Sequence, residues 1–437
     1  MIMFGIYVHV PFCLRKCDYC DFYSVPFSRE EAPHGPYLKA LLAQLDRDAP
    51  ELGLSGREIA SIYFGGGTPS IMPPEFFSKL IEALARHFSF SAELEVSCEV
   101  NPATADAAWF RAARDAGITR CSIGVQSFQD RLLRDLGRIH AADEAMRAIA
   151  EAQDAGFTGI SMDLMYAIPS ETMQELEEDV RTAMTFQPDH ISAYQLTIEE
   201  GTPLSEQYAP PLCEGRMGGV DHDLPPLSPP YKGGEALSES DQLNQMRTVD
   251  RMLSRGGWQR YEISNFAKPG CECRHNLNYW RYGEYLGLGA GAASFVTTGL
   301  GIRDSGFGIN GTSPSGFPRG DGFPNPGSRV PSPVFARRFT QARNVHAYME
   351  GNATLAESED IDVRTAMAEY CFLGLRTMEG ISASSFKHEF GVELHSIFGA
   401  EIECLVKRRL AVVSGDRMAL TQKGVEISNQ VFEKFFA

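Results

Sequence analysis

The sequence predicts an α/β protein whose core is a run of six strand–helix units. Two observations support this prediction. Within the first 200 residues, six short apolar or β-branched runs are bounded by Gly, Pro, Asn or Asp, as strands commonly are. Helical patterns separate these runs, so the strands should lie parallel and be joined by right-handed crossovers. Because six units fall short of the eight of a closed barrel, an open partial (βα)6 barrel and a doubly wound sheet both fit.

The elements of this core follow one another in a regular order. The predicted strands are Gly5–Val10, Ile59–Phe64, Leu94–Cys98, Arg120–Val125, Gly159–Met165 and His190–Leu196. The predicted helices are Pro36–Asp48, Pro73–His87, Thr104–Ala116, Asp143–Ala155 and Glu171–Thr185. Pro73-Pro74-Glu75 is a helix-start signal, and Gly117 and Gly156 stand where a helix C-cap favours glycine.

Two later stretches have the composition of inserted loops. Cys213–Ser240 and Leu300–Pro333 are rich in Gly, Pro and Ser and show no periodicity. They lack the apolar content that would offset the entropy cost of ordering, so we expect flexible surface loops. The chain then divides into a barrel core, a flexible loop, an α/β extension, a second flexible loop and a C-terminal domain, at residues 1–210, 211–240, 241–299, 300–334 and 335–437.

The C-terminal domain is predicted to be mainly helical and winged-helix-like, because helices precede a short hairpin. Its expected elements are the helices Asp362–Arg376, Ser382–Phe390 and His395–Arg408, the hairpin strands Ala411–Val413 and Arg417–Leu420, and a last helix, Thr421–Phe435. Winged helices often bind DNA, but the chain has 40 Lys and Arg against 57 Asp and Glu, a net charge of −17. Because Lys and Arg supply the affinity for nucleic acid, we expect a packing or docking module and no nucleic-acid partner.

The composition predicts a cytoplasmic protein. No apolar run reaches the roughly 18 residues of a membrane helix. Met1-Ile2-Met3-Phe4-Gly5 lacks the basic region that opens a signal peptide. Ten cysteines in 437 residues make no disulfide scaffold. In a reducing compartment, clustered cysteines need another explanation.

Three cysteines form such a cluster directly after the first predicted strand. Cys13, Cys17 and Cys20 are spaced as C-x3-C-x2-C. A disulfide would leave one thiol over, and a structural zinc site usually takes four ligands from two knuckles. Three thiolates on one loop instead suit an iron–sulfur cluster with one iron open to an outside ligand. Zinc or free thiols are the alternatives.

This loop, with the aromatic Tyr19 before its last cysteine, resembles the cluster loop of the radical SAM superfamily. The resemblance implies a partial (βα)6 barrel holding a [4Fe-4S] cluster whose open iron chelates S-adenosylmethionine (SAM). It also implies an electron donor such as flavodoxin or ferredoxin. The segment Phe64-Gly65-Gly66-Gly67-Thr68-Pro69-Ser70 resembles the superfamily's GGGTP segment. Glycines there let the backbone approach the methionine end of SAM.

Polar residues also come late in successive predicted strands. Glu99, Gln126 and Asp163 end or nearly end the third, fourth and fifth strands, and Arg138 follows the fourth. In a parallel barrel such positions meet at the carboxyl-terminal face, where sites form. The chain resembles oxygen-independent coproporphyrinogen III oxidase and its relatives, and that resemblance implies SAM-contact positions at Tyr7, Gly66, Gly67, Thr68, Glu99, Gln126, Arg138 and Asp163.

Two features indicate the branch of this family. The coproporphyrinogen oxidases carry a further cysteine two residues after the third cluster cysteine, where this chain has Phe22. The stretch Arg274-His275-Asn276-Leu277-Asn278-Tyr279-Trp280 contains the H-N-x-x-Y-W motif of HemW-type heme chaperones. The string from Pro11 to Phe22 is similar to those proteins as well.

The chemistry of this motif suits heme. His275 offers an imidazole to iron, and the rings of Tyr279 and Trp280 offer flat faces to a porphyrin. A buried structural histidine beside core aromatics is the alternative. Cys271 and Cys273 precede His275 as C-x-C-x-H, and we interpret them as chance cysteines rather than heme ligands. Ala293 stands where the family commonly has histidine, which weakens the heme prediction.

The sequence therefore favours a radical SAM heme chaperone, which binds heme and passes it to an apo-hemoprotein acceptor such as a respiratory-chain enzyme. Any peripheral membrane association would then come through the acceptor. The alternative is an oxygen-independent coproporphyrinogen III oxidase, which decarboxylates propionate side chains oxidatively with SAM. Phe22 argues against that enzyme activity, and we assign no catalytic residue. A radical SAM methyltransferase, or another substrate class on the same scaffold, has no positive support in the sequence.

Overall fold

The computed structural model describes residues 3–208, 237–297 and 334–436. Most of the two predicted flexible loops, 211–240 and 300–334, lies outside these described residues. Their described ends carry regular structure. Helix α8 (Glu239–Gly256) begins before the first predicted loop ends, and strand β13 (Val334–Gln341) begins at the last residue of the second.

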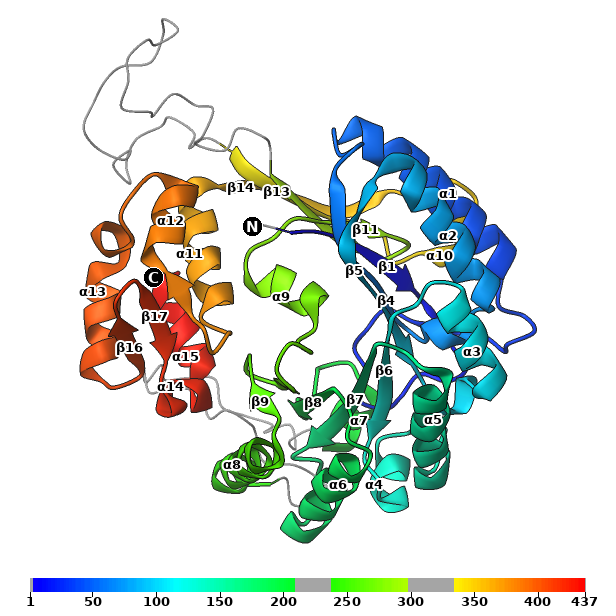
Figure 1. The fold of residues 1–437 in the computed structure, drawn as a ribbon, viewed down its shortest axis with the longest axis horizontal. Coiled ribbons are helices and arrows are strands. Elements are labelled where there is room, and N and C mark those ends of the chain that lie inside the picture. The colour runs from blue at the N-terminus through cyan, green and yellow to red at the C-terminus, as the bar shows by residue number, and fades with distance from the viewer. Residues whose placement is uncertain (1–2, 209–236, 298–333, 437) are drawn as a thin grey trace, which may run out of the picture.

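A curved sheet of 12 strands forms the centre of the molecule (Figure 1). Its middle consists of six mutually parallel strands, which are β1 (Phe4–Val10), β4 (Glu58–Gly66), β5 (Ser89–Val100), β6 (Arg120–Gln126), β7 (Gly159–Tyr166) and β8 (His190–Gln195). They follow one another across the sheet in chain order, without the reversal that defines a doubly wound sheet. The prediction of an open, partial barrel is therefore confirmed.

Helices cover the convex, outer side of these strands (Figure 1). The five predicted helices are present as α1 (His34–Glu51), α2 (Pro74–His87), α3 (Ala107–Asp115), α5 (Ala142–Ala155) and α6 (Met173–Thr185). Helix α3 starts three residues later than expected, because Asp106 rather than Thr104 caps it by accepting a hydrogen bond from the Trp109 backbone N–H. The short helices α4 (Asp130–Asp135) and α7 (Pro203–Tyr208) were not predicted.

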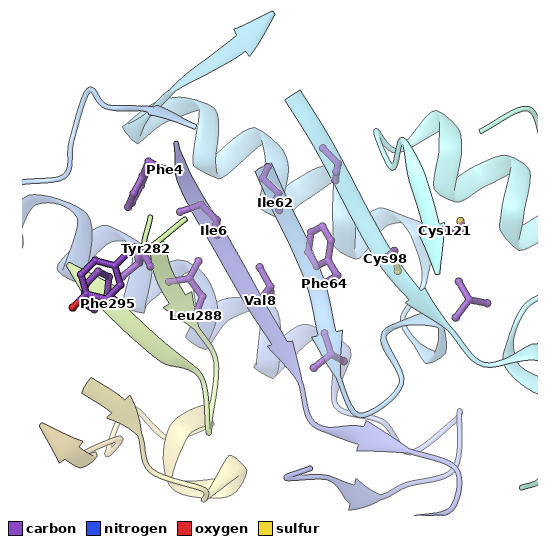
Figure 2. Close-up of a cluster of buried hydrophobic side chains, with 14 of the residues drawn as sticks. Phe4, Ile6, Val8, Ile62, Phe64, Cys98, Cys121, Tyr282, Leu288 and Phe295 are labelled. Carbon is purple, nitrogen blue, oxygen red and sulfur yellow. The ribbon is translucent and has the colours of Figure 1, made fainter. Parts of the chain in front are cut away.

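The alternation of side chains along each strand separates the core from the barrel interior. Figure 2 shows Ile6 and Val8 of β1 beside Ile62 and Phe64 of β4, in the cluster of buried apolar side chains. Successive residues of a strand point to opposite faces of the sheet. Tyr7 and its register partner Tyr63 therefore face the other side, toward the barrel interior. The alternation places polar groups inside the barrel while the helices seal the apolar face.

Six further strands extend the parallel set at both edges. The sequence analysis predicted an α/β extension over 241–299 but did not locate any of these strands. On the β1 side these are β11 (Tyr285–Leu288), β12 (Ala293–Thr297), β13 and β14 (Leu355–Asp362), and on the β8 side β10 (Asn265–Ala267) and β9 (Gln259–Arg260). Strand β11 pairs in parallel with β1, and the outer strands pair antiparallel. Because β14 and all but the first residue of β13 lie within 335–437, that region is less purely helical than expected.

The C-terminal region has the predicted order of helices and hairpin. Its helices α11 (Val363–Gly374), α12 (Ala383–Phe390) and α13 (Leu394–Lys407) precede the hairpin of β16 (Ala411–Ser414) and β17 (Arg417–Leu420). The short strand β15 (Ile381–Ser382), between α11 and α12, was not predicted and adds a third strand to the hairpin. The prediction of one last helix over Thr421–Phe435 was wrong. Ile427, at φ −125° and ψ 35°, leaves helical geometry and separates α14 (Gln422–Glu426) from α15 (Ser428–Phe432).

This C-terminal region packs against the barrel through helix α9 (Arg274–Trp280) and neighbouring loops. The guanidinium of Arg376 lies 4.4 Å from the ring centroid of Trp280, a cation–π contact. The Met378 backbone N–H donates to the Tyr261 carbonyl oxygen at 2.9 Å. Helix α9 therefore lies between the barrel and the C-terminal region, as Figure 1 shows. Among the described residues, no helix is long and apolar enough to cross a membrane.

Candidate cluster and cofactor site

The barrel interior holds a cavity of about 410 Å³ that opens at the carboxyl ends of the parallel strands. Such ends meet at one face of the sheet, where ligands commonly bind. Most of the residues that the sequence marked as a site line this cavity: Cys13, Cys17, Tyr19, Cys20, Gly66, Gly67, Thr68, Glu99, Gln126, Arg138 and Asp163. The structure does not bring Tyr7 or His275 to its surface.

The three cysteines lie on one loop that starts from β1 and returns beside it. Strand β2 (Phe12–Cys13) pairs with β3 (Val25–Pro26), which closes the loop. The Thr68 hydroxyl donates to the Cys13 Sγ at 3.2 Å, and the Arg138 guanidinium lies 3.5 Å from the Cys17 Sγ. Burial raises the pKa of the Cys13 thiol, and the Thr68 hydroxyl opposes that shift. Iron binds the thiolate form of cysteine.

The three thiols match the donor set of an iron–sulfur cluster. In a [4Fe-4S] cluster each protein thiolate binds a different iron, so three thiolates on one loop leave one iron open to an outside ligand. Among the described residues, no three His, Cys, Asp or Glu side chains converge closely enough to hold one metal ion.

The glycine segment at the end of β4 forms one wall of the cavity. Gly66 has φ +108°, and a Cβ there would lie 2.5 Å from the His9 ring. A Cβ on Gly67 would lie 2.9 Å from the backbone oxygens of Phe12 and Val10. Glycine is favoured at both positions, because a side chain would collide with the His9 ring or with these backbone oxygens behind the wall. On the cavity side Gly66 and Gly67 offer only backbone atoms to a bound SAM.

Glu99, near the end of β5, is held by two donors. The Tyr63 hydroxyl donates to its Oε1 at 2.9 Å, and the Gly66 backbone N–H donates to its Oε2 at 3.2 Å. Burial raises the pKa of Glu99 to about 7. The two donors lower this pKa, whereas the neighbouring Asp163 raises it. The carboxylate is therefore poised to exchange its proton close to neutral pH.

Asp163 and Arg138 supply opposite charges to the same cavity. The Ser122 hydroxyl donates to both Asp163 oxygens, at 3.0 and 3.1 Å. Burial raises the pKa of Asp163, and the Ser192 and Ser122 hydroxyls oppose that shift. Arg138 Nη2 donates to the Gly124 carbonyl oxygen at 2.6 Å, whereas its buried Nε has no partner among the described residues. A buried, unpaired N–H in a cavity wall is a ready donor to a polar ligand.

Sequence comparison adds an independent observation to this geometry. The chain is 31% identical over 433 residues to the heme chaperone HemW of Escherichia coli, covering 99% of this chain and 98% of the relative. It is 30% identical to the heme chaperone HemW of Haemophilus influenzae, covering 99% and 97%. The chain belongs to the HemW family. Within this family assignment, residues 7–183 match the radical SAM superfamily and residues 361–427 match the HemN C-terminal domain.

The fold of this HemW family member also resembles that of a solved enzyme. It superposes on coproporphyrinogen III oxidase HemN of Escherichia coli with a TM-score of 0.73, covering 99% of this chain and 90% of that one. At 18% identity this likeness concerns the fold alone. Membership of the radical SAM superfamily implies a [4Fe-4S] cluster and SAM, and the cysteines, glycines and buried donors described above fit both groups.

Two predicted site residues lie behind the cavity wall of this HemW family member. The Tyr7 hydroxyl is hydrogen-bonded to His9 Nδ1 at 2.9 Å, and its ring lies against Tyr63. His275 is 1% exposed, with Nδ1 2.9 Å from the Ser61 Oγ and Nε2 2.9 Å from the Tyr279 hydroxyl. Since both ring nitrogens are engaged, His275 has no free nitrogen for iron, and this arrangement matches the alternative of a buried structural histidine.

Sequence reasoning missed the polar floor of the cavity. Cys273 and Asn276, at the start of α9, lie there together with buried polar residues of the strands: Ser97, Arg120, Ser122, Ser161, His190 and Ser192. The period-two alternation of polar residues along β5 to β8 was the available signal. Phe22 also lines the cavity and is 69% exposed, at the position where the oxidases carry a further cysteine.

Proposed function

We propose that this protein binds heme and transfers it to apo-protein acceptors, and that its radical SAM site holds a [4Fe-4S] cluster and SAM. The observation that carries this proposal is the match, over nearly its whole length, to relatives named heme chaperones. The cavity supports it, because the cluster cysteines and the glycine wall are both intact.

Within this proposal the residues divide into two groups. Cys13, Cys17 and Cys20 hold three irons of the cluster, which supplies one-electron chemistry at its open iron. Tyr19 lies on the cluster loop, and Arg138 lies beside it, 3.5 Å from the Cys17 Sγ. The remaining positions face SAM and bind or orient it: Gly66, Gly67, Thr68, Glu99, Gln126 and Asp163. Tyr7 acts one layer behind, because its ring lies against Tyr63, whose hydroxyl donates to Glu99.

We further propose a cytoplasmic protein with three kinds of partner. Heme is the cargo, an apo-hemoprotein such as a respiratory-chain enzyme is the acceptor, and flavodoxin or ferredoxin reduces the cluster. Contact with a membrane would come only through the acceptor. The net charge of −17 disfavours direct attraction to anionic lipid surfaces and nucleic acid.

The test is a heme titration of anaerobically reconstituted full-length protein, run beside a coproporphyrinogen turnover assay. We expect saturable binding of about one heme per chain, as for a single site, and no SAM-dependent decarboxylation of coproporphyrinogen. Phe22 in place of the oxidases' further cysteine is the reason to expect no turnover. Decarboxylation without measurable heme binding would overturn the proposal in favour of the oxidase.

Glu99 gives the SAM site an expected pH dependence. Its pKa of about 7 means that the charged carboxylate is lost as the pH falls through neutrality. The charged form attracts the cationic groups of SAM, so SAM affinity should fall by up to about tenfold for each pH unit below that pKa. The measurement is the SAM-induced change in the electron paramagnetic resonance (EPR) signal of the reduced cluster, recorded against pH.

Glu99→Gln should remove this pH dependence, because its amide does not titrate near pH 7. Glu58→Gln, an exposed residue of the neighbouring strand β4, is the matched control and should keep it. An unchanged pH profile in Glu99→Gln would show that another group controls SAM affinity.

A further inference from the structure

A second cavity of about 410 Å³ lies between the barrel and the C-terminal region. We call it the aromatic cavity and define it by Tyr279, Tyr282, Tyr285, Phe295, Arg338 and Phe372. These residues come from α9, β11, β12, β13, α11 and the loop after α9. Its volume is that of a site for a cofactor-sized ligand.

Helix α9 is the wall that this cavity shares with the radical SAM site. Asn276 lines the radical SAM cavity and Tyr279, one turn later, lines the aromatic cavity. Tyr279 is fixed by its hydroxyl, which lies 2.9 Å from Nε2 of His275. The H-N-x-x-Y-W motif therefore contributes a ring to the second cavity, while its histidine positions that ring from behind.

The walls of the aromatic cavity suit a flat, apolar ligand. The rings of Tyr279 and Tyr285 meet edge to face with centroids 4.6 Å apart, and those of Tyr282 and Phe295 lie 4.7 Å apart. Figure 2 shows Tyr282 and Phe295 together at the end of the buried cluster. Rings held by such contacts offer fixed faces and edges against which a planar macrocycle can pack.

Arg338 and Glu369 are the charged residues of this lining in the described part of the chain. Glu369 is already satisfied, because Arg338 Nη2 donates to both its oxygens at 2.8 and 2.7 Å and the Tyr282 hydroxyl donates at 2.9 Å. In the described part of the chain, Arg338 Nη1 pairs only with Glu359, at 3.3 Å, and the Glu359 side chain is 60% exposed. An exposed ion pair of this kind is weak, so a ligand carboxylate can replace Glu359.

Tyr285 presents the remaining polar group. Within the described ranges, no hydrogen-bond partner of its hydroxyl is found, and the ring is half-buried. Burial raises the pKa of this hydroxyl, and nearby Arg338 opposes the shift. Phenolic oxygen is one of the few protein groups that ligate heme iron, so an unpartnered phenol in an aromatic cavity is a candidate ligand.

We propose that the aromatic cavity is the heme-binding site, with the Tyr285 oxygen as an iron ligand and Arg338 as the partner of a heme propionate. This inference rests on the proposed heme-binding function. On binding ferric heme, the Tyr285 hydroxyl releases its proton to solvent and its oxygen bonds the iron. This heme-binding site lies outside the radical SAM cavity, so heme and SAM can bind the protein at the same time.

The test is a ferric heme titration of the reconstituted full chain and three variants. Tyr285→Phe keeps the ring, so it should fold normally yet shift the heme Soret band and weaken binding. Arg338→Gln should weaken heme binding about 10- to 100-fold, the range of a charge-assisted hydrogen bond. Arg337→Gln, the neighbouring residue that pairs with Asp360 on the outer strands, is the matched control and should bind as the wild type does.

Cluster absorbance and the EPR response to SAM report whether each variant is folded. One outcome is that the wild type binds heme while Tyr285→Phe and Arg338→Gln bind it with unchanged spectrum and affinity. In that case the aromatic cavity is not the heme-binding site, although the heme-binding function stands. If the wild type does not bind heme, the proposed function itself fails and this inference falls with it.

Discussion

Replacing Cys13, Cys17 or Cys20 by alanine is expected to abolish the iron–sulfur cluster. All three sulfurs line the barrel cavity on one short loop, and in the described residues no other cysteine is placed on that loop. A cluster that is bound by only three protein thiolates is lost when one of them is removed. Anaerobically reconstituted wild-type protein should hold about four iron and four sulfide per chain and show an absorbance shoulder at about 400 nm, whereas each variant should show neither.

Cys404→Ala is the control for this experiment, because Cys404 is an exposed cysteine of the C-terminal helix α13. Its iron and sulfide content should equal that of the wild type. Full cluster content in a variant lacking all three loop cysteines would remove the assignment of the loop as a cluster site.

Gly66→Ala is expected to disable the same site without touching a thiol. Gly66 has φ +108°, which residues with a side chain rarely adopt, and the new Cβ would lie 2.5 Å from the His9 ring. That ring cannot easily move, because it is hydrogen-bonded to the Tyr7 hydroxyl and to the Tyr23 carbonyl oxygen, each at 2.9 Å. We expect a loss of roughly 1–3 kcal/mol in the free energy of unfolding and loss of the SAM-induced EPR change.

Gly35→Ala provides the matched glycine control. Gly35 lies in the first turn of α1 with no other atom within 4 Å of the added Cβ, and its φ is negative. Alanine there should leave stability unchanged or raise it slightly, by about 0.4–1 kcal/mol. Thermal denaturation measures the change in stability, and the EPR response measures the effect on SAM binding. A Gly66→Ala protein as stable and as responsive to SAM as the Gly35→Ala protein would contradict the role assigned to the glycine wall.

Much of the barrel and its site could be predicted because their signals are local. Glu99 and Asp163 come late in strands whose apolar runs are bounded by turn residues, and parallel strands bring such positions to one face. The glycines were recognised through the resemblance of their segment to the superfamily's GGGTP segment, and the structure adds a reason, since a positive φ and a close backbone approach tolerate few other residues. The strand-end positions needed only the strand that carries each residue.

The features that were missed depend on tertiary partners. Strand β14 has the polar sequence Leu-Ala-Glu-Ser-Glu-Asp-Ile-Asp and forms only because its backbone pairs with β13 at an exposed edge of the sheet. The spacing of the H-N-x-x-Y-W motif likewise did not show which side chain reaches a cavity. Helix α9 turns His275 into the protein interior and leaves Tyr279 on the aromatic cavity, and this depends on Ser61 of a distant strand.

The central claim is that this protein hands heme to other proteins, and the most direct test is a transfer assay. Heme-loaded, reconstituted protein is mixed with an apo-hemoprotein acceptor, and the two are separated and assayed for heme. We predict that the Soret absorbance leaves this protein and appears in the acceptor faster than heme released from a control protein, serum albumin, would reach it. Heme that stays bound, or that reaches the acceptor no faster than from albumin, would contradict the claim.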